Sequence, residues 1–119
     1  MEINVIYILA PASAATGGPE ALHQLANALN KNFNFKIKMV YLPKNVHNPV
    51  HDNYKNYSIE HTNIIDDDEK NILIAPEYYE YLEELNKYKK IKKIIWWLSL
   101  DNYLNSRFRK KNFKFLRSL

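Results

Sequence analysis

The chain has 119 residues, 46% of them hydrophobic and 25% charged, which is typical of one soluble globular domain. It contains no cysteine, so disulfide bonds, thiolate metal sites and cysteine nucleophiles are excluded. No basic region precedes a short apolar run at the N-terminus, and no run is long enough to cross a bilayer. We therefore expect neither a signal peptide nor a transmembrane helix, and a cytoplasmic protein.

The net charge of +4 is concentrated at the C-terminus. Residues 103–119 contain six of the 17 basic residues and no acidic one, whereas residues 1–102 contain eleven basic and 13 acidic residues. We therefore divide the chain into a domain over 1–104 and a basic, aromatic tail over 105–119. Such an asymmetry indicates a separate partner for the tail.

The first half of the chain predicts a strand, a helix and a second strand. Residues 3–9 (INVIYIL) are rich in β-branched and aromatic side chains and too few for a typical helix, so they predict a strand. A helix follows, with Pro19 in its first turn. Its apolar residues have the i, i+3, i+4, i+7 spacing of one buried face: Leu22, Leu25, Ala26 and Leu29. Residues 35–42 (FKIKMVYL) predict the second strand, which Pro43 ends.

The second half predicts two more central strands around a helix. Residues 44–61 are polar and read as a long loop or as short irregular elements, and 61–65 as a short edge strand. Residues 71–75 (NILIA) predict a buried strand, 78–88 an amphipathic helix, and 92–98 (KKIIWWL) a further strand. The order strand–helix–strand, repeated twice, predicts an α/β fold: a Rossmann-like parallel sheet of about four to five strands with helices on both faces.

The only two glycines of the chain, Gly17 and Gly18, are adjacent and lie between the first strand and the first helix. Ligands of open parallel sheets bind beyond the carboxyl ends of the strands, near the first such connection. Glycine accepts a positive φ and lets a ligand approach the backbone, and the helix N-terminus favours a phosphate or carboxylate. The alternative is that the glycines only permit a tight turn. Neither a G-x-G-x-x-G fingerprint nor a P-loop is present.

Three segments together resemble one family of enzymes. They are "PASAATGGPEALHQLANAL" after the first strand, "ILIAPEYY" at residues 72–79 and "IIWWLSLDNY" at residues 94–103. In this order they are similar to the N-terminal domain of bacterial GT-B glycosyltransferases of the surface-polysaccharide type, whose first loop carries a Gly-Gly-x-Glu motif, here residues 17–20.

The resemblance implies a nucleotide-sugar donor, a glycan or lipid-linked acceptor, no metal and no other cofactor. It implies that the amides of Gly17 and Gly18 approach the donor phosphates, and it places Glu20 among the substrate-binding residues. GT-B enzymes are well over twice as long, because a C-terminal domain with an E-x7-E signature binds the donor. We therefore expect this acceptor-side domain to be inactive or incomplete alone.

Three further polar residues are candidates for the site. Asp101 follows the strand over 92–98, so we expect its carboxylate at the same sheet edge as the glycines, where it would orient or deprotonate an acceptor hydroxyl. Asn102 would bind a sugar hydroxyl. Both are also residue types that cap helices and form Asx turns, and this alternative stays open. Glu77 would contact the sugar or the phosphate side, or simply suit the first turn of a helix.

The histidines and tryptophans have ordinary structural interpretations. His47 and His51 are four residues apart, but Pro49 between them disfavours a helix and no third ligand is evident, so we expect no metal site. His23 adjoins the apolar face of its helix and is expected to pack. Trp96 and Trp97 face opposite sides of a strand, and core packing is favoured over sugar stacking.

The tail leaves several partners open. Its aromatic residues and cations suit the surface of an anionic membrane, which would make the protein peripheral to the inner membrane. They also suit packing on a second domain, with the cations solvated. Two other functions compete with the enzyme: a small homo-oligomeric binding module whose glycine turn takes an anion, and a nucleic-acid-associated domain, which we consider the less favoured.

Overall fold

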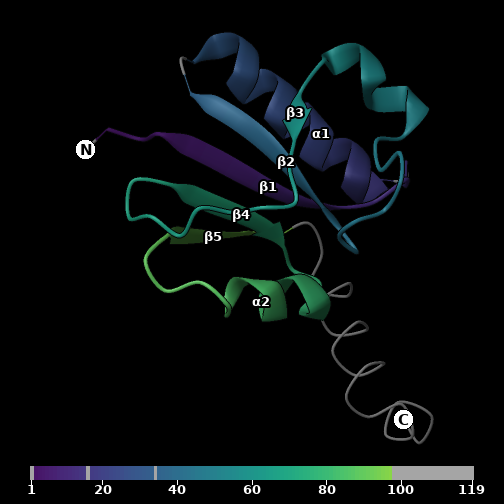
Figure 1. Ribbon diagram of the computed structural model, residues 1–119. Helices are drawn as coiled ribbons and strands as arrows, with labels where there is room; N and C mark the ends of the chain where they lie inside the picture. The colour runs from purple at the N-terminus through teal and green to yellow at the C-terminus, as the bar shows by residue number, and fades with distance from the viewer. Residues whose placement is uncertain (1, 16, 34, 98–119) are drawn as a thin grey trace, which may run out of the picture.

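The computed structural model describes residues 2–15, 17–33 and 35–97, which form a five-stranded, all-parallel sheet with helices on both faces (Figure 1). The elements in chain order are β1 (Val5–Pro11), α1 (Gly17–Asn32), β2 (Lys36–Leu42), the 3₁₀ helix η1 (Asp52–Tyr57), β3 (Glu60–His61), β4 (Ile72–Pro76), α2 (Tyr79–Leu85) and β5 (Lys92–Trp96). The predicted Rossmann-like α/β class is confirmed. No helix within the described ranges is long and apolar enough to cross a membrane.

The strands lie in the order β3-β2-β1-β4-β5. The chain therefore builds outward from β1 to β3, returns to the centre at β4, and builds outward again in the other direction. The reversal falls between β1 and β4, which pair in parallel through Tyr7 and Leu73. In open α/β sheets this switch point is where a crevice opens at the carboxyl ends of the strands.

The two faces of the sheet are covered by different helices (Figure 1). On one face α1 packs on β1 and β2, with Leu22 and Ala26 buried against alternate strand residues such as Ile8 and Met39. On the other face α2 packs on β4, with Tyr81 and Leu85 as its buried residues. Alternate side chains of β1, β2 and β4 thus enter two separate cores, as the period of two in a strand requires.

The element boundaries differ from the sequence-based expectations in ways that matter for the site. Strand β1 starts and ends two residues later than expected, at Val5 and Pro11, and α1 already begins at Gly17. The segment over 44–61 contains η1, and the edge strand is only the two residues of β3. The expectation of core packing is wrong for Trp97, whose surface is 53% exposed beyond the end of β5.

Candidate functional site

A cavity of about 630 Å³ opens at the carboxyl edge of the sheet, and we call it the edge pocket. Its walls come from the ends of β1 and β2, from the start of α1 and from the start of α2. The lining residues are Pro11, Ala14, Pro19, Leu42, Pro43, Tyr78, Glu80 and Tyr81. The pocket therefore brings the β1 and β4 connections together at the switch point of the sheet, and its volume is that of a small-molecule site.

The edge pocket combines apolar walls with a few oxygen atoms. Tyr78 and Tyr81 form an edge-to-face pair with ring centroids 6.0 Å apart, and Glu80 beside them is exposed. Burial raises the pKa of Tyr81 well above its ordinary value, so its hydroxyl stays protonated and can donate. Among the described lining residues none is basic. This chemistry suits a neutral ligand with an apolar face and hydroxyl groups better than it suits a phosphate.

The glycines lie at the start of α1, next to this pocket. Gly17 is exposed, Gly18 is half-buried, and Pro19, one residue on, lines the pocket. None of the described glycines has a positive φ, and a Cβ added to Gly17 would meet no atom within 4 Å. The left-handed conformation that would demand glycine is therefore not used here. The positive φ in this connection belongs instead to Ser13, at 55°.

The other predicted site residues lie in different environments. Glu20 is exposed in the first turn of α1, 3.5 Å from the amide of Gln24, and does not line the edge pocket. Glu77 directly follows β4 and is fully buried. Asp101 and Asn102 lie outside the described residues, as does the tail over 105–119. The structure thus brings the glycine turn, but neither Glu20 nor an accessible Glu77, to the pocket.

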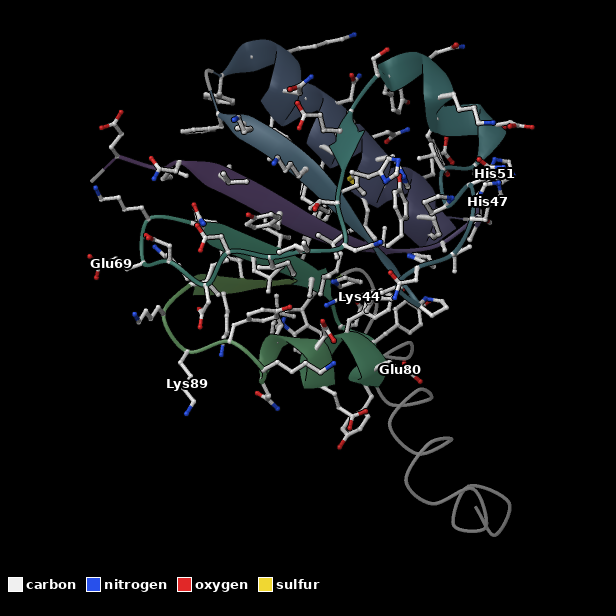
Figure 2. All side chains as sticks on the ribbon, in the orientation of Figure 1. Lys44, His47, His51, Glu69, Glu80 and Lys89 are labelled. Carbon is white, nitrogen blue, oxygen red and sulfur yellow. The ribbon has the colours of Figure 1, made fainter. Side chains whose placement is uncertain are left out.

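Sequence reasoning missed the residues that give the pocket its chemistry. In the sequence, Tyr78 and Tyr81 belong to the apolar face of the helix predicted over 78–88, and no motif singles out Glu80. A signal was available: a Tyr-x-Glu-Tyr run at 78–81 directly follows a buried strand, and parallel strands end at the edge where ligands bind. Figure 2 shows Glu80 at the end of α2 that faces this edge, while Glu69 and Lys89 lie at the opposite end of the sheet.

A buried ion pair fixes two walls of the edge pocket to each other. Lys44, two residues after the β2 end, places its Nζ 2.8 Å from Oε1 of Glu84 on α2. Glu84 is only 5% exposed, also bonds Lys87 Nζ at 2.7 Å, and accepts from the Tyr88 hydroxyl at 3.3 Å. Burial acts to raise the pKa of Glu84, but the hydrogen bonds from the two lysines outweigh it and hold the pKa below its ordinary value.

A buried histidine organises the other side of the same edge. His23 of α1 is 2% exposed, with Nδ1 2.6 Å from the Pro19 carbonyl oxygen and Nε2 2.8 Å from the Tyr41 hydroxyl. A carbonyl only accepts, so Nδ1 carries the proton and Nε2 accepts from Tyr41. Tyr54 of η1 lies flat on the imidazole, with centroids 3.8 Å apart and planes 7° apart. The packing role expected for His23 is confirmed, and its contacts extend from α1 to Tyr41 of β2 and Tyr54 of η1.

A metal site would need several His, Asp or Glu side chains close together. Within residues 2–15, 17–33 and 35–97, no group of three His, Asp or Glu side chains is arranged to hold a metal ion. His51 instead accepts a hydrogen bond from the Asn53 backbone at 3.0 Å and so caps η1.

Neither the family models, nor the curated proteins, nor the solved structures compared with this chain gave a match.

Proposed function

We propose that this chain is the N-terminal, acceptor-side domain of a nucleotide-sugar-dependent glycosyltransferase of the GT-B type that acts in bacterial surface-glycan assembly. The observation that carries the proposal is the edge pocket, which lies at the switch point of a Rossmann-like sheet. The Gly-Gly-x-Glu motif begins α1 beside this pocket, and its Pro19 is one of the lining residues. The three segments that resemble the family supply the reaction class, and the pocket supplies a place for its acceptor.

The chemistry of the pocket supports a glycan as the ligand. A sugar ring presents C–H groups on its faces and hydroxyls on its rim. The rings of Tyr78 and Tyr81 offer apolar surface to the first, and the Glu80 carboxylate accepts hydrogen bonds from the second. Because the described lining contains no cation, the pocket has little to offer the diphosphate of a donor. This division agrees with an acceptor-side role.

In the proposed reaction an acceptor hydroxyl attacks the anomeric carbon of the donor sugar, and a nucleoside diphosphate leaves. The edge pocket would hold the acceptor so that its hydroxyl projects past the start of α1. The exposed backbone at Gly17 would then lie on the side of the leaving diphosphate, whose growing negative charge fixed N–H groups stabilise. Asp101 remains the proposed group for orienting or deprotonating the hydroxyl.

The proposal is tested by glycan binding to the full chain. In ¹⁵N-resolved NMR titrations with methyl glycosides of common surface-glycan sugars, we expect saturable shifts at residues 78–81 with dissociation constants on the order of 1 mM. Glu80→Gln removes the negative charge and replaces one of the two acceptor oxygens with an NH2 donor, so it should weaken binding by about fivefold. Glu83→Gln is the matched control, because Glu83 is an exposed carboxylate of the same helix that does not line the pocket.

Two results would count against the proposal. One is a set of glycan shifts that Glu80→Gln and Glu83→Gln alter equally, since the ligand would then not use the edge pocket. The other is tight binding of a nucleotide sugar to this chain alone, since an acceptor-side domain should bind donors very weakly or not at all. A lipid-linked acceptor and contact of the basic tail with the inner membrane belong to the same proposal, and vesicle co-sedimentation tests them.

The exposed edge strand favours a second candidate, a homo-oligomeric binding module. On β5 both Ile94 and Ile95 are 38–40% exposed although they face opposite sides of the sheet, and Trp97 follows them. No described strand pairs with the outer edge of β5, and apolar side chains gathered on such an edge are typical of an interaction surface. Sedimentation velocity distinguishes the two: a concentration-dependent dimer that Ile95→Lys abolishes supports the module, and a monomer at all concentrations rejects it.

A further inference from the structure

A second cavity, of about 440 Å³, lies on the other side of the β2 end, and we call it the loop pocket. It is enclosed by the segment after β2, by η1 and by β3. Its lining residues are Val46, His47, Asn48, Pro49, Val50, Tyr54, Lys55, Ser58, Ile59 and His61. The labels of Figure 2 place His47 at the same end of the sheet as Glu80 of the edge pocket.

The polar side chains of the loop pocket differ in kind from those of the edge pocket. His47, Lys55 and His61 are groups that carry or accept a positive charge, and Asn48 and Ser58 add N–H and O–H donors. Among the described lining residues there is no carboxylate. The edge pocket shows the reverse, a carboxylate and two phenols without a described cation. The loop pocket is therefore richer in hydrogen-bond donors, whereas the edge pocket has the carboxylate of Glu80 as an acceptor.

The walls of the loop pocket are held in place before any ligand arrives. Tyr54 is stacked on His23, and His61 meets the ring of Tyr41 edge-on with centroids 5.9 Å apart. Since His23 and Tyr41 are buried and hydrogen-bonded to each other, both walls rest on one fixed pair. A binding site whose walls are already ordered loses less conformational entropy when it binds.

The backbone of the loop pocket is fixed as well. The Ser13 amide donates to the Pro49 carbonyl at 2.7 Å, and the Ser13 hydroxyl lies 3.2 Å from the Asn48 carbonyl oxygen. Both Asn48 and Ser58, which line the cavity, have a positive φ, of 54° and 56°. Non-glycine residues in this conformation persist where the surrounding structure determines it. The segment is thus tied to the connection that leads into α1.

We propose that the loop pocket binds a small anionic ligand, with a phosphate or carboxylate group against His47, Lys55 and His61 and a partly apolar body against Val50 and Ile59. Anionic oxygens accept strong, charge-assisted hydrogen bonds from such groups. The mixture of three cationic or donor side chains with aliphatic walls is the usual make-up of a site for a small acidic molecule. The site is separate from the proposed glycan site, so it goes beyond the proposed function.

An ion pair between Lys55 and Asp52 should weaken anion binding at the loop pocket. Lys55 Nζ lies 2.7 Å from Oδ1 of Asp52, one helical turn away on η1, and both side chains are exposed. Asp52 does not line the pocket, and its carboxylate competes with the ligand for the ammonium group. Replacing Asp52 with Asn should therefore tighten anion binding, because it leaves the Lys55 ammonium group free for the ligand.

The test uses the full chain and three small probes in phosphate-free buffer: phenyl phosphate, benzoate and, as the uncharged analogue, benzyl alcohol. Binding is followed by ¹⁵N-resolved NMR at residues 46–61. We expect saturable binding of at least one anion with a dissociation constant on the order of 1 mM. Preference for phenyl phosphate identifies a phosphate ligand and preference for benzoate a carboxylate. The double variant Lys55→Gln, His61→Gln should weaken binding at least fivefold, and Asp52→Asn should tighten it two- to threefold.

Lys93→Gln is the matched control, because Lys93 is exposed on β5 and lies outside both cavities. It should leave the affinity unchanged. Unchanged signals of the β1 core in each variant show that the fold is retained. Benzyl alcohol binding as tightly as the anions, or anion affinity that Lys55→Gln, His61→Gln leaves intact, overturns the proposal. Neither result touches the glycan site, which is read at residues 78–81.

Discussion

At the scale of single residues, the most constrained side chain is His23. Its two ring nitrogens have different partners, a carbonyl that can only accept and a hydroxyl that does both, so the neutral tautomer with the proton on Nδ1 satisfies both. Burial lowers the pKa of His23 and keeps it uncharged, opposed by the hydrogen bond to Pro19. The residue therefore connects α1 to β2 and η1 as a fully satisfied polar group inside an apolar face.

Tyr41 and Tyr54 provide a matched pair for testing this arrangement, because both are buried and both contact the His23 ring. Tyr41→Phe removes the donor to Nε2 and leaves a buried nitrogen unsatisfied, so we expect it to cost about 1–3 kcal/mol. The Tyr54 hydroxyl is buried with no hydrogen-bond partner in the described part of the chain. Tyr54→Phe should therefore be neutral or slightly stabilising. Urea unfolding measures both, and equal losses would refute the assigned bonding.

At the scale of elements, the start of α1 raises the question of whether Gly17 is needed for the fold or for binding a ligand. Gly17 is the first residue of the helix, lacks a positive φ and has open space where a Cβ would lie. Neither conformation nor sterics in the described structure requires glycine there. What remains is backbone exposed beside the edge pocket, which a methyl group would partly cover.

Gly17→Ala tests that distinction directly. Alanine restricts the unfolded chain and favours the helix, so we expect the free energy of unfolding to rise by about 0.5–1 kcal/mol or to stay unchanged. In a complete enzyme containing this domain, the same change should lower turnover if the bare backbone faces the leaving phosphate. Thermal unfolding and initial rates give the two quantities. Full turnover with unchanged stability would mean that the glycine serves no role at this position.

The junction between the β2 connection and α2 depends on one buried carboxylate. Lys44→Met removes the partner of Glu84 that comes from the connection after β2, and it leaves a 5% exposed carboxylate with fewer bonds. We expect a loss of about 1–3 kcal/mol. Lys87→Met is the control just after the end of α2: Lys87 is far more exposed, so about 0–1 kcal/mol should be lost. Denaturant midpoints compare the two, and a larger loss for Lys87→Met would contradict the structural role of Lys44.

The elements were largely predictable because their signals are local. Short apolar runs and the helical spacing of apolar residues predicted both helices and four of the five strands, β1, β2, β4 and β5, and Pro43 was correctly expected to follow the second strand directly. The edge strand was overestimated because β3 pairs with β2 through only two residues, a length that no local pattern encodes. Trp97 was misjudged because the alternation rule gives the side of a strand, but not whether a helix covers that side.

The candidate site was less predictable, because it is assembled at the scale of the whole molecule. The sheet edge and the position of Gly17 follow from the strand–helix–strand order along the chain, which predicts a parallel sheet. The edge pocket, however, joins Pro11, Leu42 and Tyr78 from three connections, and its shape depends on how α2 is tilted and held by Glu84. The loop pocket depends on η1 and on left-handed residues such as Asn48, in a segment that gave no periodic signal.

At the scale of the described molecule, the shifted pKa values of its histidine, carboxylates and tyrosines all favour the folded state near neutral pH. Folding lowers the pKa values of His23, Asp52, Asp67 and Glu84. For Asp67 the main cause is the set of backbone N–H groups at residues 89–91 that donate to its carboxylate. Folding raises the pKa values of the buried tyrosines, chiefly by burial. At acid pH the unfolded chain therefore binds more protons than the folded one, and at alkaline pH it releases more.

The sign of these shifts predicts a stability plateau with two separate steps on its acid side. The first step belongs to His23, whose pKa is lower in the folded chain than the ordinary value of 6.5. As the pH falls below 6.5, His23 is protonated in the unfolded chain but stays neutral in the folded one, so the free energy of unfolding decreases. The decrease ends once the pH is below the pKa of His23 in the folded chain. A second decrease begins below 4.5 and 3.8, the ordinary values for Glu and Asp, as the paired carboxylates are protonated. Above 10, loss of tyrosine protons from the unfolded chain lowers stability again.

His23→Gln keeps an amide donor for Pro19 and an acceptor for Tyr41 but cannot titrate, so it should lower overall stability while removing only the first acid step. Urea midpoints measured from about pH 2.5 to pH 11 resolve the steps, and an acid limb with the same shape in His23→Gln as in the natural chain would show that His23 is not the group responsible.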